Sequence, residues 1–274
     1  MTLYMAGIAF CCGVIGGLVG AFQECMLAGM LAIFVTAFPR QILMGNLLSY
    51  GFIPYVAFSG AVAATAYASK IRKHDLAGTD ILKSLKRTGD VSVFLVSGLF
   101  AVIGLGLAVL VGKAGLPIDA GSVSVIISAS LVRVIFGDGK FLNREFKNVS
   151  RYNDNKAEWL FLICLGLFFG TAAGFIAKET GNAFLPFYLS LASLLFYFLE
   201  PEFPPSHHMT CTAAYAFMAT GSILQCAVWG AIACLSCTFI GDLINTDSST
   251  HIDPPATTIG IMSVVIYIIY YVIL

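Results

Sequence analysis

Two short polar turns in the second half of the chain combine histidines with prolines. The first reads Pro204-Pro205-Ser206-His207-His208-Met209-Thr210. Prolines cannot lie within a regular helix but suit the residues around its start, so we expect a helix to begin near Ser206 or His207. Imidazole gains and loses a proton near neutral pH. An adjacent histidine pair beside an apolar helix is costly unless it faces protein or water, which favours a functional site over a lipid-headgroup loop.

The second turn reads Thr250-His251-Ile252-Asp253-Pro254-Pro255-Ala256-Thr257-Thr258. Asp253 suits the N-cap of a helix whose first turn holds the prolines. Capping alone explains Asp253 but leaves His251 without a role. A capped helix end inside a membrane is also a ready ion or solute site, so a cap and a cap that lines a pathway both remain open.

Asp253 has a counterpart in the first half of the chain. The stretch Pro117–Ser124 contains Asp119 and precedes an apolar run, at an offset of 134 residues. Two further pairs of segments match in the same order: residues 64–68 with 212–216, and 16–20 with 170–174. Duplicated halves with equivalent acidic residues are typical of transport pathways.

The histidines of the first turn are not duplicated. Residues 148 positions before His207 and His208 are Ser59 and Gly60. Small and hydroxyl residues are repeated instead, namely Ser59, Ser122 and Ser124 against Thr210, Thr257 and Thr258. We therefore expect an asymmetric pathway that is titratable at one end.

The composition assigns the chain to the membrane. Hydrophobic residues make up 58% and charged residues 11%, with a mean hydropathy of +0.89, whereas soluble domains carry roughly 25% charged residues. The apolar runs are continuous rather than alternating, which predicts helices. The net charge of zero gives no indication of nucleic-acid binding. All eight cysteines lie in apolar segments and show no disulfide pattern.

We expect an all-α polytopic membrane protein with about ten segments in two repeats of five, some short, broken or re-entrant. The segments are about 4–22, 25–38, 52–69, 91–112 and 120–136, then 159–177, 182–199, 204–220, 222–241 and 255–274. Repeat 1 takes residues 1–140, a cytoplasmic linker 141–157, and repeat 2 residues 158–274. Among these segments, 25–38 and 204–220 are the ones expected to be tilted, broken or re-entrant.

Lysines and arginines orient the segments. They gather in two loops, which hold Lys70, Arg72, Lys73, Lys83, Lys86 and Arg87, and Lys140, Arg144, Lys147, Arg151 and Lys156. Short basic loops stay in the cytoplasm. Five crossings per half would make the halves an inverted repeat, with the Asp119 turn and both termini outside and the Asp253 turn inside. Arg133 is expected to snorkel to the cytoplasmic surface, and Glu24 is expected to lie at the membrane–water interface.

Three stretches resemble a family of small, uncharacterised prokaryotic membrane proteins. They are Val56–Gly60 with Ala66–Ala68, the His207–Thr210 turn, and Thr250–Ala256. More distantly, residues 251–256 resemble the His-Pro-Pro turn of the HPP membrane family, some of which are linked to nitrite transport. Ile252 and Asp253 interrupt that motif here, so the substrate does not carry over. The resemblance implies a permease without naming its cargo.

The leading functional prediction is a multi-pass cell-membrane channel or secondary transporter for a small ion or solute, with its pathway between the repeats. We expect a protein that is not an enzyme, and ATP hydrolysis in particular is not expected because no Gly-x4-Gly-Lys-Ser/Thr loop occurs. The alternative is an intramembrane metal site, for transport or catalysis, in which His207, His208, His251 and Asp253 bind Zn²⁺ or Fe²⁺. A third reading is an assembly subunit, and self-association stays open. The predicted pathway residues are His207, His208, Thr210, His251, Asp253, Asp119, Ser59 and Ser122.

Overall fold

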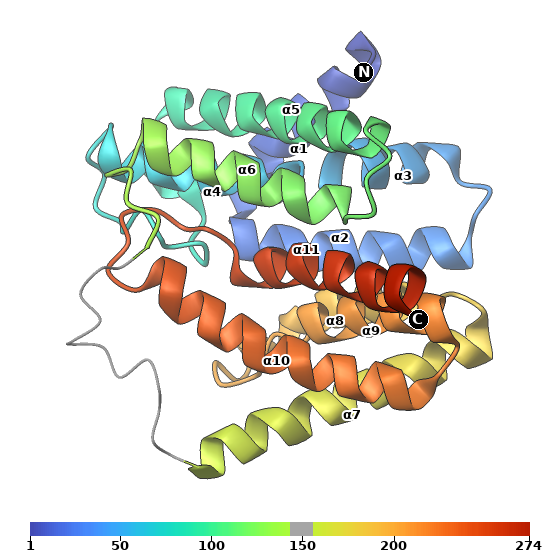
Figure 1. Ribbon diagram of the computed structural model, residues 1–274. Helices are drawn as coiled ribbons and strands as arrows, with labels where there is room; N and C mark the ends of the chain where they lie inside the picture. The colour runs from blue at the N-terminus through green and yellow to red at the C-terminus, as the bar shows by residue number, and fades with distance from the viewer. Residues whose placement is uncertain (143–155) are drawn as a thin grey trace.

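The computed structural model describes residues 1–142 and 156–274, and every regular element in them is helical (Figure 1). The first half contains α1 (Leu3–Val19), α2 (Ala21–Ala37), α3 (Ile42–Leu47), the π-helical turn η1 (Leu48–Phe52), α4 (Ala57–Lys70), the 3-10 turn η2 (Leu85–Thr88), α5 (Val91–Lys113) and α6 (Ala120–Ile135). The second half contains α7 (Lys156–Thr180), α8 (Leu185–Ser193), the 3-10 turn η3 (Leu194–Phe198), α9 (His207–Thr220), α10 (Ile223–Asn245), α11 (Pro254–Tyr267) and the π-helical turn η4 (Ile268–Ile273).

Five helical segments of the described chain are long and apolar enough to cross a membrane. They are Val91–Lys113, Lys156–Thr180, Ile223–Asn245, Pro254–Ile273 and Ile42–Lys70, in which η1 and a short turn join α3 to α4. The helices α1, α2, α6 and α9 have only 14 to 17 residues, or about 21–26 Å at 1.5 Å per residue, against a hydrocarbon core of ~30 Å. Helices therefore occur at each predicted place, but only five segments have the length of a full crossing.

Capping side chains mark the starts of α6 and α11, and a proline pair precedes the start of α9. Asp119 accepts a hydrogen bond from the Ser122 N–H at 2.5 Å at the start of α6. Asp253 accepts one from the Ala256 N–H at 2.8 Å, with prolines in the first turn of α11. The helix α9 begins at His207, directly after the proline pair. The predicted helix starts and the capping role of Asp253 are confirmed.

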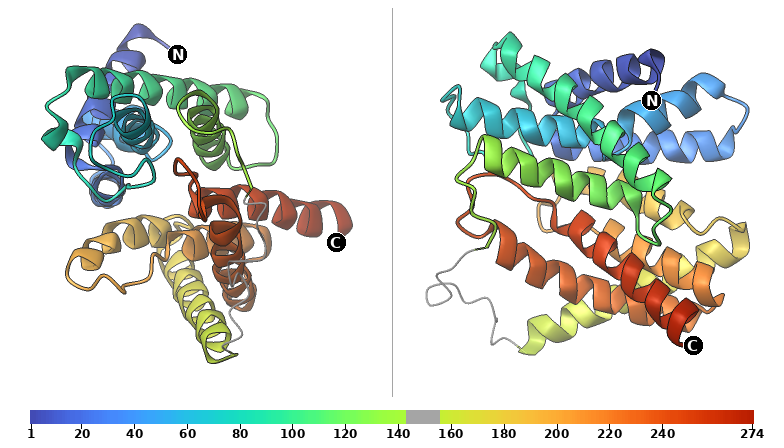
Figure 2. Two further views of the ribbon diagram at one scale, coloured as in Figure 1. Left: turned by 90° about the vertical axis from the view of Figure 1, so that its left-hand side faces the viewer. Right: turned by 45° about the horizontal axis from the view of Figure 1, so that its top comes forward.

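The two halves pack their helices in the same pattern. In the first half α5 contacts α1, α4 and α6, and α1 contacts α4; in the second half α10 contacts α7, α9 and α11, and α7 contacts α9. The pattern pairs α1 with α7, α4 with α9, α5 with α10 and α6 with α11. Figure 2 shows the first half, coloured blue to green, above the second half, coloured yellow to red.

Equivalent elements of the two halves meet at their interface. The helix α2 packs against α8, where a Cβ added to Gly29 would collide with the backbone of Ala192. Nearer the start of α2, the ring of Phe22 lies 5.1 Å from that of Tyr197, which follows α8. Because residues early in α2 contact residues after α8, these two helices run antiparallel.

The helices α6 and α11 also run antiparallel across the interface (Figure 1). At the start of α6 the N–H of Asp119 donates to Ser263 Oγ, in the last part of α11, at 3.0 Å. At the end of α6, Arg133 donates through Nε to Thr250 Oγ1, just before α11, at 3.2 Å.

Arg133 is fully buried, so the expectation that it snorkels to the surface is wrong. Besides Thr250 Oγ1, its guanidinium donates to the carbonyl oxygens of Thr250 at 2.5 Å and Ile244 at 2.7 Å, and to Asn245 Oδ1 at 3.2 Å. These bonds satisfy the charged group inside the protein. They fix the end of α6 to the connection between α10 and α11.

The basic loop 71–90 and the turn after α6 lie beside the segment that leads into α11. Asp138 Oδ1 accepts from Ser249 Oγ at 2.9 Å, and a Cβ on Gly78 would collide with the carbonyl of Ser249. Much of the predicted cytoplasmic linker, including Arg144, Lys147 and Arg151, lies outside the described residues.

Candidate functional site

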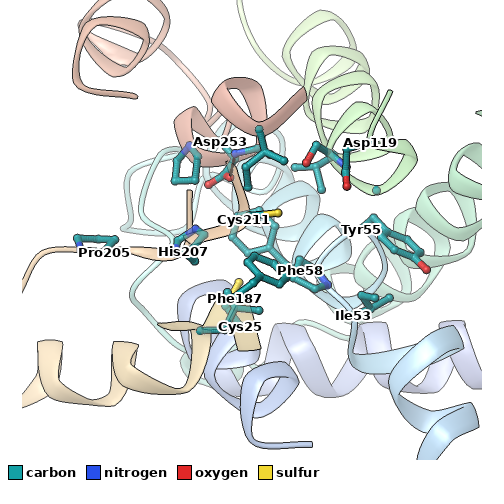
Figure 3. A pocket seen from close by; sticks show the side chains of 18 of the residues that line it. Cys25, Ile53, Tyr55, Phe58, Asp119, Phe187, Pro205, His207, Cys211 and Asp253 are labelled. Atoms are coloured by element: carbon teal, nitrogen blue, oxygen red, sulfur yellow. Dashed lines mark hydrogen bonds between the residues drawn. The ribbon is translucent and has the colours of Figure 1, made fainter. Parts of the chain in front are cut away.

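A cavity of about 440 Å³ lies between the two halves. The first half contributes side chains from α2, α4, α6 and the segment before α4. The second half contributes side chains from α8, α9, α11 and the turns that precede α9 and α11. Figure 3 shows Asp119, Asp253, His207 and Tyr55 around this space. Neither half alone would enclose it.

Most of the cavity wall is aromatic or aliphatic. Seven aromatic residues line it, namely Phe22, Tyr55, Phe58, Phe184, Phe187, Tyr188 and Tyr215. The thiols of Cys25 and Cys211 and the hydroxyl-bearing Ser122 complete the wall beside the ionisable groups. Apolar walls with a few polar groups are typical of a binding pocket for a small molecule or ion.

Asp253 uses its two carboxyl oxygens differently. Oδ2 caps α11, while Oδ1 lies 3.5 Å from His251 Nε2. The His251 ring contacts Phe58 of the other half edge-on, with the ring centroids 6.4 Å apart. Capping therefore leaves one oxygen of Asp253 available to a partner at the cavity.

Asp119 connects the two halves at the cavity wall. Its Oδ1 caps α6, and its Oδ2 accepts a hydrogen bond from the hydroxyl of Tyr215 in α9. Tyr215 also packs edge-on against Phe184, with the ring centroids 5.5 Å apart. Both acidic side chains are thus oriented by a helix start and by one side-chain partner.

The two histidines of α9 occupy different environments. His207 lines the cavity and packs against Phe187, with the ring centroids 6.5 Å apart. His208 is 5% exposed and lies behind the wall, with its ring centroid 6.0 Å from that of His207. The Nδ1 atoms of both rings are buried without a hydrogen-bond partner. Both Nδ1 atoms are therefore closed to solvent in this conformation.

The structure brings five of the eight predicted pathway residues to one cavity. They are His207, His251, Asp253, Asp119 and Ser122. Thr210 instead shares a buried hydrogen bond with Ser190 of α8 at 2.7 Å. Ser59 lies in a narrow recess beside His251 and Asp253, and His208 lies behind His207.

The alternative metal site is not preformed in this conformation. Among residues 1–142 and 156–274, no group of three or more His, Cys, Asp and Glu side chains converges as metal ligands. The Nδ1 atom of His208 is buried without a partner, His208 is not among the residues that line the cavity, and one oxygen of Asp253 is engaged as a cap. The four side chains are neighbours without forming a ligand set.

Several residues at the site were not predicted. Tyr215 lies within the repeated segment 212–216, and that repeat is the feature of the sequence that could have drawn attention to it. Nothing in the repeat indicated its hydrogen bond to Asp119. Cys25 and Cys211 were expected to pack as small hydrophobes, and both face the cavity. Glu24, expected at an interface, is fully buried.

No curated protein and no solved structure matches the chain. A family model matches it over two successive segments, residues 1–157 and 138–274, which fits two repeats and together spans the whole sequence. The likeness to the HPP family stays a prediction. The chain belongs to the family of unknown function DUF7973.

Proposed function

We propose that the protein is a membrane permease, either a channel or a secondary transporter, for a small ion or solute. The cavity between the halves is its binding position. The observation that carries the proposal is that both repeats supply a helix-capping aspartate to one aromatic-walled cavity.

The proposed architecture is an inverted repeat. Antiparallel packing of α6 with α11, and of α2 with α8, supports this relation because like elements meet in opposite directions. In inverted-repeat transporters, one half rocks against the other around a central site. The α2–α8 and α6–α11 contacts are the surfaces that such a motion would change.

A divalent-metal transporter or enzyme is less well supported than a permease for another solute. The described residues contain no preformed ligand group, and the neighbouring side chains are engaged in capping and packing. Metal analysis of the purified protein tests this alternative directly, and a stoichiometric Zn²⁺ or Fe²⁺ content would favour it.

The proposed function is tested by flux into proteoliposomes. The screen covers inorganic anions, monovalent and divalent cations and small neutral solutes, with protein-free vesicles as the blank. We expect at least one class to enter faster with protein. The permease proposal would be contradicted if no solute class entered faster than in protein-free vesicles although folded protein is inserted in both orientations.

His207→Ala and Asp253→Asn then test the site. We expect both variants to abolish flux with modest effects on the melting temperature, because Asn remains a good N-cap while losing the charge. His74→Ala and Asp75→Asn, in the loop outside the cavity, are the matched controls and should retain flux. Wild-type flux in both site variants would return these residues to a purely structural role.

A further inference from the structure

Glu24 is a carboxylic acid buried in the core of the first half. It lies in the first turn of α2 and is 0% exposed. The Phe58 backbone N–H at the start of α4 interacts with its carboxyl group, whereas no side chain donates a hydrogen bond to either carboxyl oxygen. A buried acid without a side-chain partner requires an explanation, because such groups are rare unless they are functional.

The elements packed against α2 bring no cation to Glu24. Two thiols, Cys12 of α1 and Cys25 of α2, are the titratable side chains that interact with it electrostatically. The other packed elements, η1, α8 and η3, carry only tyrosines as titratable groups, and α3 carries none; these are Tyr50, Tyr188 and Tyr197. The environment therefore offers no counter-charge from these elements.

The nearby charged residues are already placed elsewhere. Lys70 is at the far end of α4. In the loop that covers the start of α2, Lys83 Nζ pairs with Asp80 Oδ2 at 2.6 Å. The positive end of the α4 dipole favours an anion, but this effect is small beside the cost of burying an unpaired carboxylate. No cation therefore compensates a negative charge on Glu24 in this conformation.

The two chain neighbours of Glu24 contact the basic loop and the cavity. Its neighbour Gln23 donates from Nε2 to the Leu82 carbonyl of that loop at 2.6 Å. Its other neighbour, Cys25, lines the cavity together with Phe58 (Figure 3). The helix α2 is also one of the elements at which the two halves meet.

We propose that Glu24 is a proton-binding site that couples proton movement to solute passage through the cavity. The proposal rests on the permease function. When α2 shifts against α8, water reaches Glu24, its O–H bond breaks, the proton passes to that water and a carboxylate remains. A hydronium ion on the opposite side of the membrane then donates the proton that restores the neutral acid, and Glu24 is buried again.

Infrared spectroscopy of the purified protein tests proton binding without any transported solute. We expect the carbonyl stretch of a neutral carboxylic acid near neutral pH, and its loss in Glu24→Gln. Asp119→Asn and Asp253→Asn are controls that should retain the band. If Glu24→Gln fails to fold, Glu24→Asp serves instead and should shift the band. An unchanged band in the Glu24 variant would overturn the proposal.

Coupling is tested in proteoliposomes with a solute found by the flux screen. We expect a pH gradient to drive accumulation by the wild type, and Glu24→Gln to reach only the level seen without a gradient while still exchanging solute. A wild type that transports but ignores the gradient would overturn the coupling and leave the permease intact. If the wild type transports nothing, the permease and the coupling both fail, and the infrared result alone decides whether Glu24 binds a proton.

Discussion

At the scale of single residues, polar groups in the apolar interior are held by partners far away in the chain. Asp119 is held by Tyr215, and Arg133 by Thr250 and its neighbours. Each of these bonds joins one half to the other. The same side chains that satisfy buried polar groups therefore also fix how the repeats sit against each other.

Arg133→Gln should destabilise the protein. Hydrogen bonds to a charged group contribute roughly 1.5–3 kcal/mol, and unpaired buried acceptors add a cost, so we expect a loss of about 3 kcal/mol. The loss is measured as a lower melting temperature in detergent. Arg40→Gln, which removes an exposed arginine, is the control and should melt like the wild type. Equal melting temperatures of the two variants would contradict the role of Arg133 in fixing the end of α6 to the connection between α10 and α11.

The sequence indicated the local structure of the candidate site residues better than it indicated their surroundings. The histidine turn and the two aspartate turns could be predicted because prolines and capping residues act on near neighbours. The burial of Arg133 could not, because its acceptors are 111 to 117 positions away. Glu24 likewise looks interfacial beside a helix junction, and only the loop and the helices around it make it buried.

At the scale of elements, local signals set helix starts well and helix continuity poorly. The apolar run 52–69 was predicted as one segment, whereas the chain leaves η1 at Phe52 and begins α4 at Ala57. Pro54 lies in this break and lacks the N–H that a continuous helix needs. The break matters because Ile53, Pro54 and Tyr55 all line the cavity.

Gly29→Ala tests the contact between equivalent elements. The added methyl group would collide with the backbone of α8, so we expect a loss of roughly 1–3 kcal/mol, as for other overpacked interiors, and a lower melting temperature. Gly106→Ala in α5 is the matched control, because nothing lies within 4 Å of its added Cβ. The control should be neutral or slightly stabilising, since Ala favours helix. A Gly29 variant that melts like the control would mean that α2 and α8 separate without cost.

At the scale of the whole molecule, the duplication could be predicted but the cavity could not. Three matching segments and two acidic turns indicate two related halves. The position of the cavity depends on how α2 crosses α8 and α6 crosses α11, and on which side chains fill the space between them. Those crossings are decided by close approaches such as Gly29 against Ala192, which no periodicity in the sequence reports.

The proposed inverted repeat predicts opposite exposure of the two turns that precede α6 and α11. We expect Ala114→Cys, in the turn before α6, to react with a membrane-impermeant maleimide in intact right-side-out vesicles. Asp247→Cys, before α11, should react only after permeabilisation, because that turn lies beside the basic loop that we expect on the cytoplasmic side.

Two controls make the labelling decisive. Asp75→Cys in the basic loop should behave like Asp247→Cys, and the exposed native Cys11 is replaced by Ser throughout. Because α6 and α11 pack antiparallel, turns that precede them should lie on opposite membrane faces if both helices stand across the bilayer. Reaction of Ala114→Cys and Asp247→Cys from the same face would exclude an inverted repeat. Alternating access by rocking of two inverted halves would then be excluded as well. The cavity would instead belong to a channel-like path.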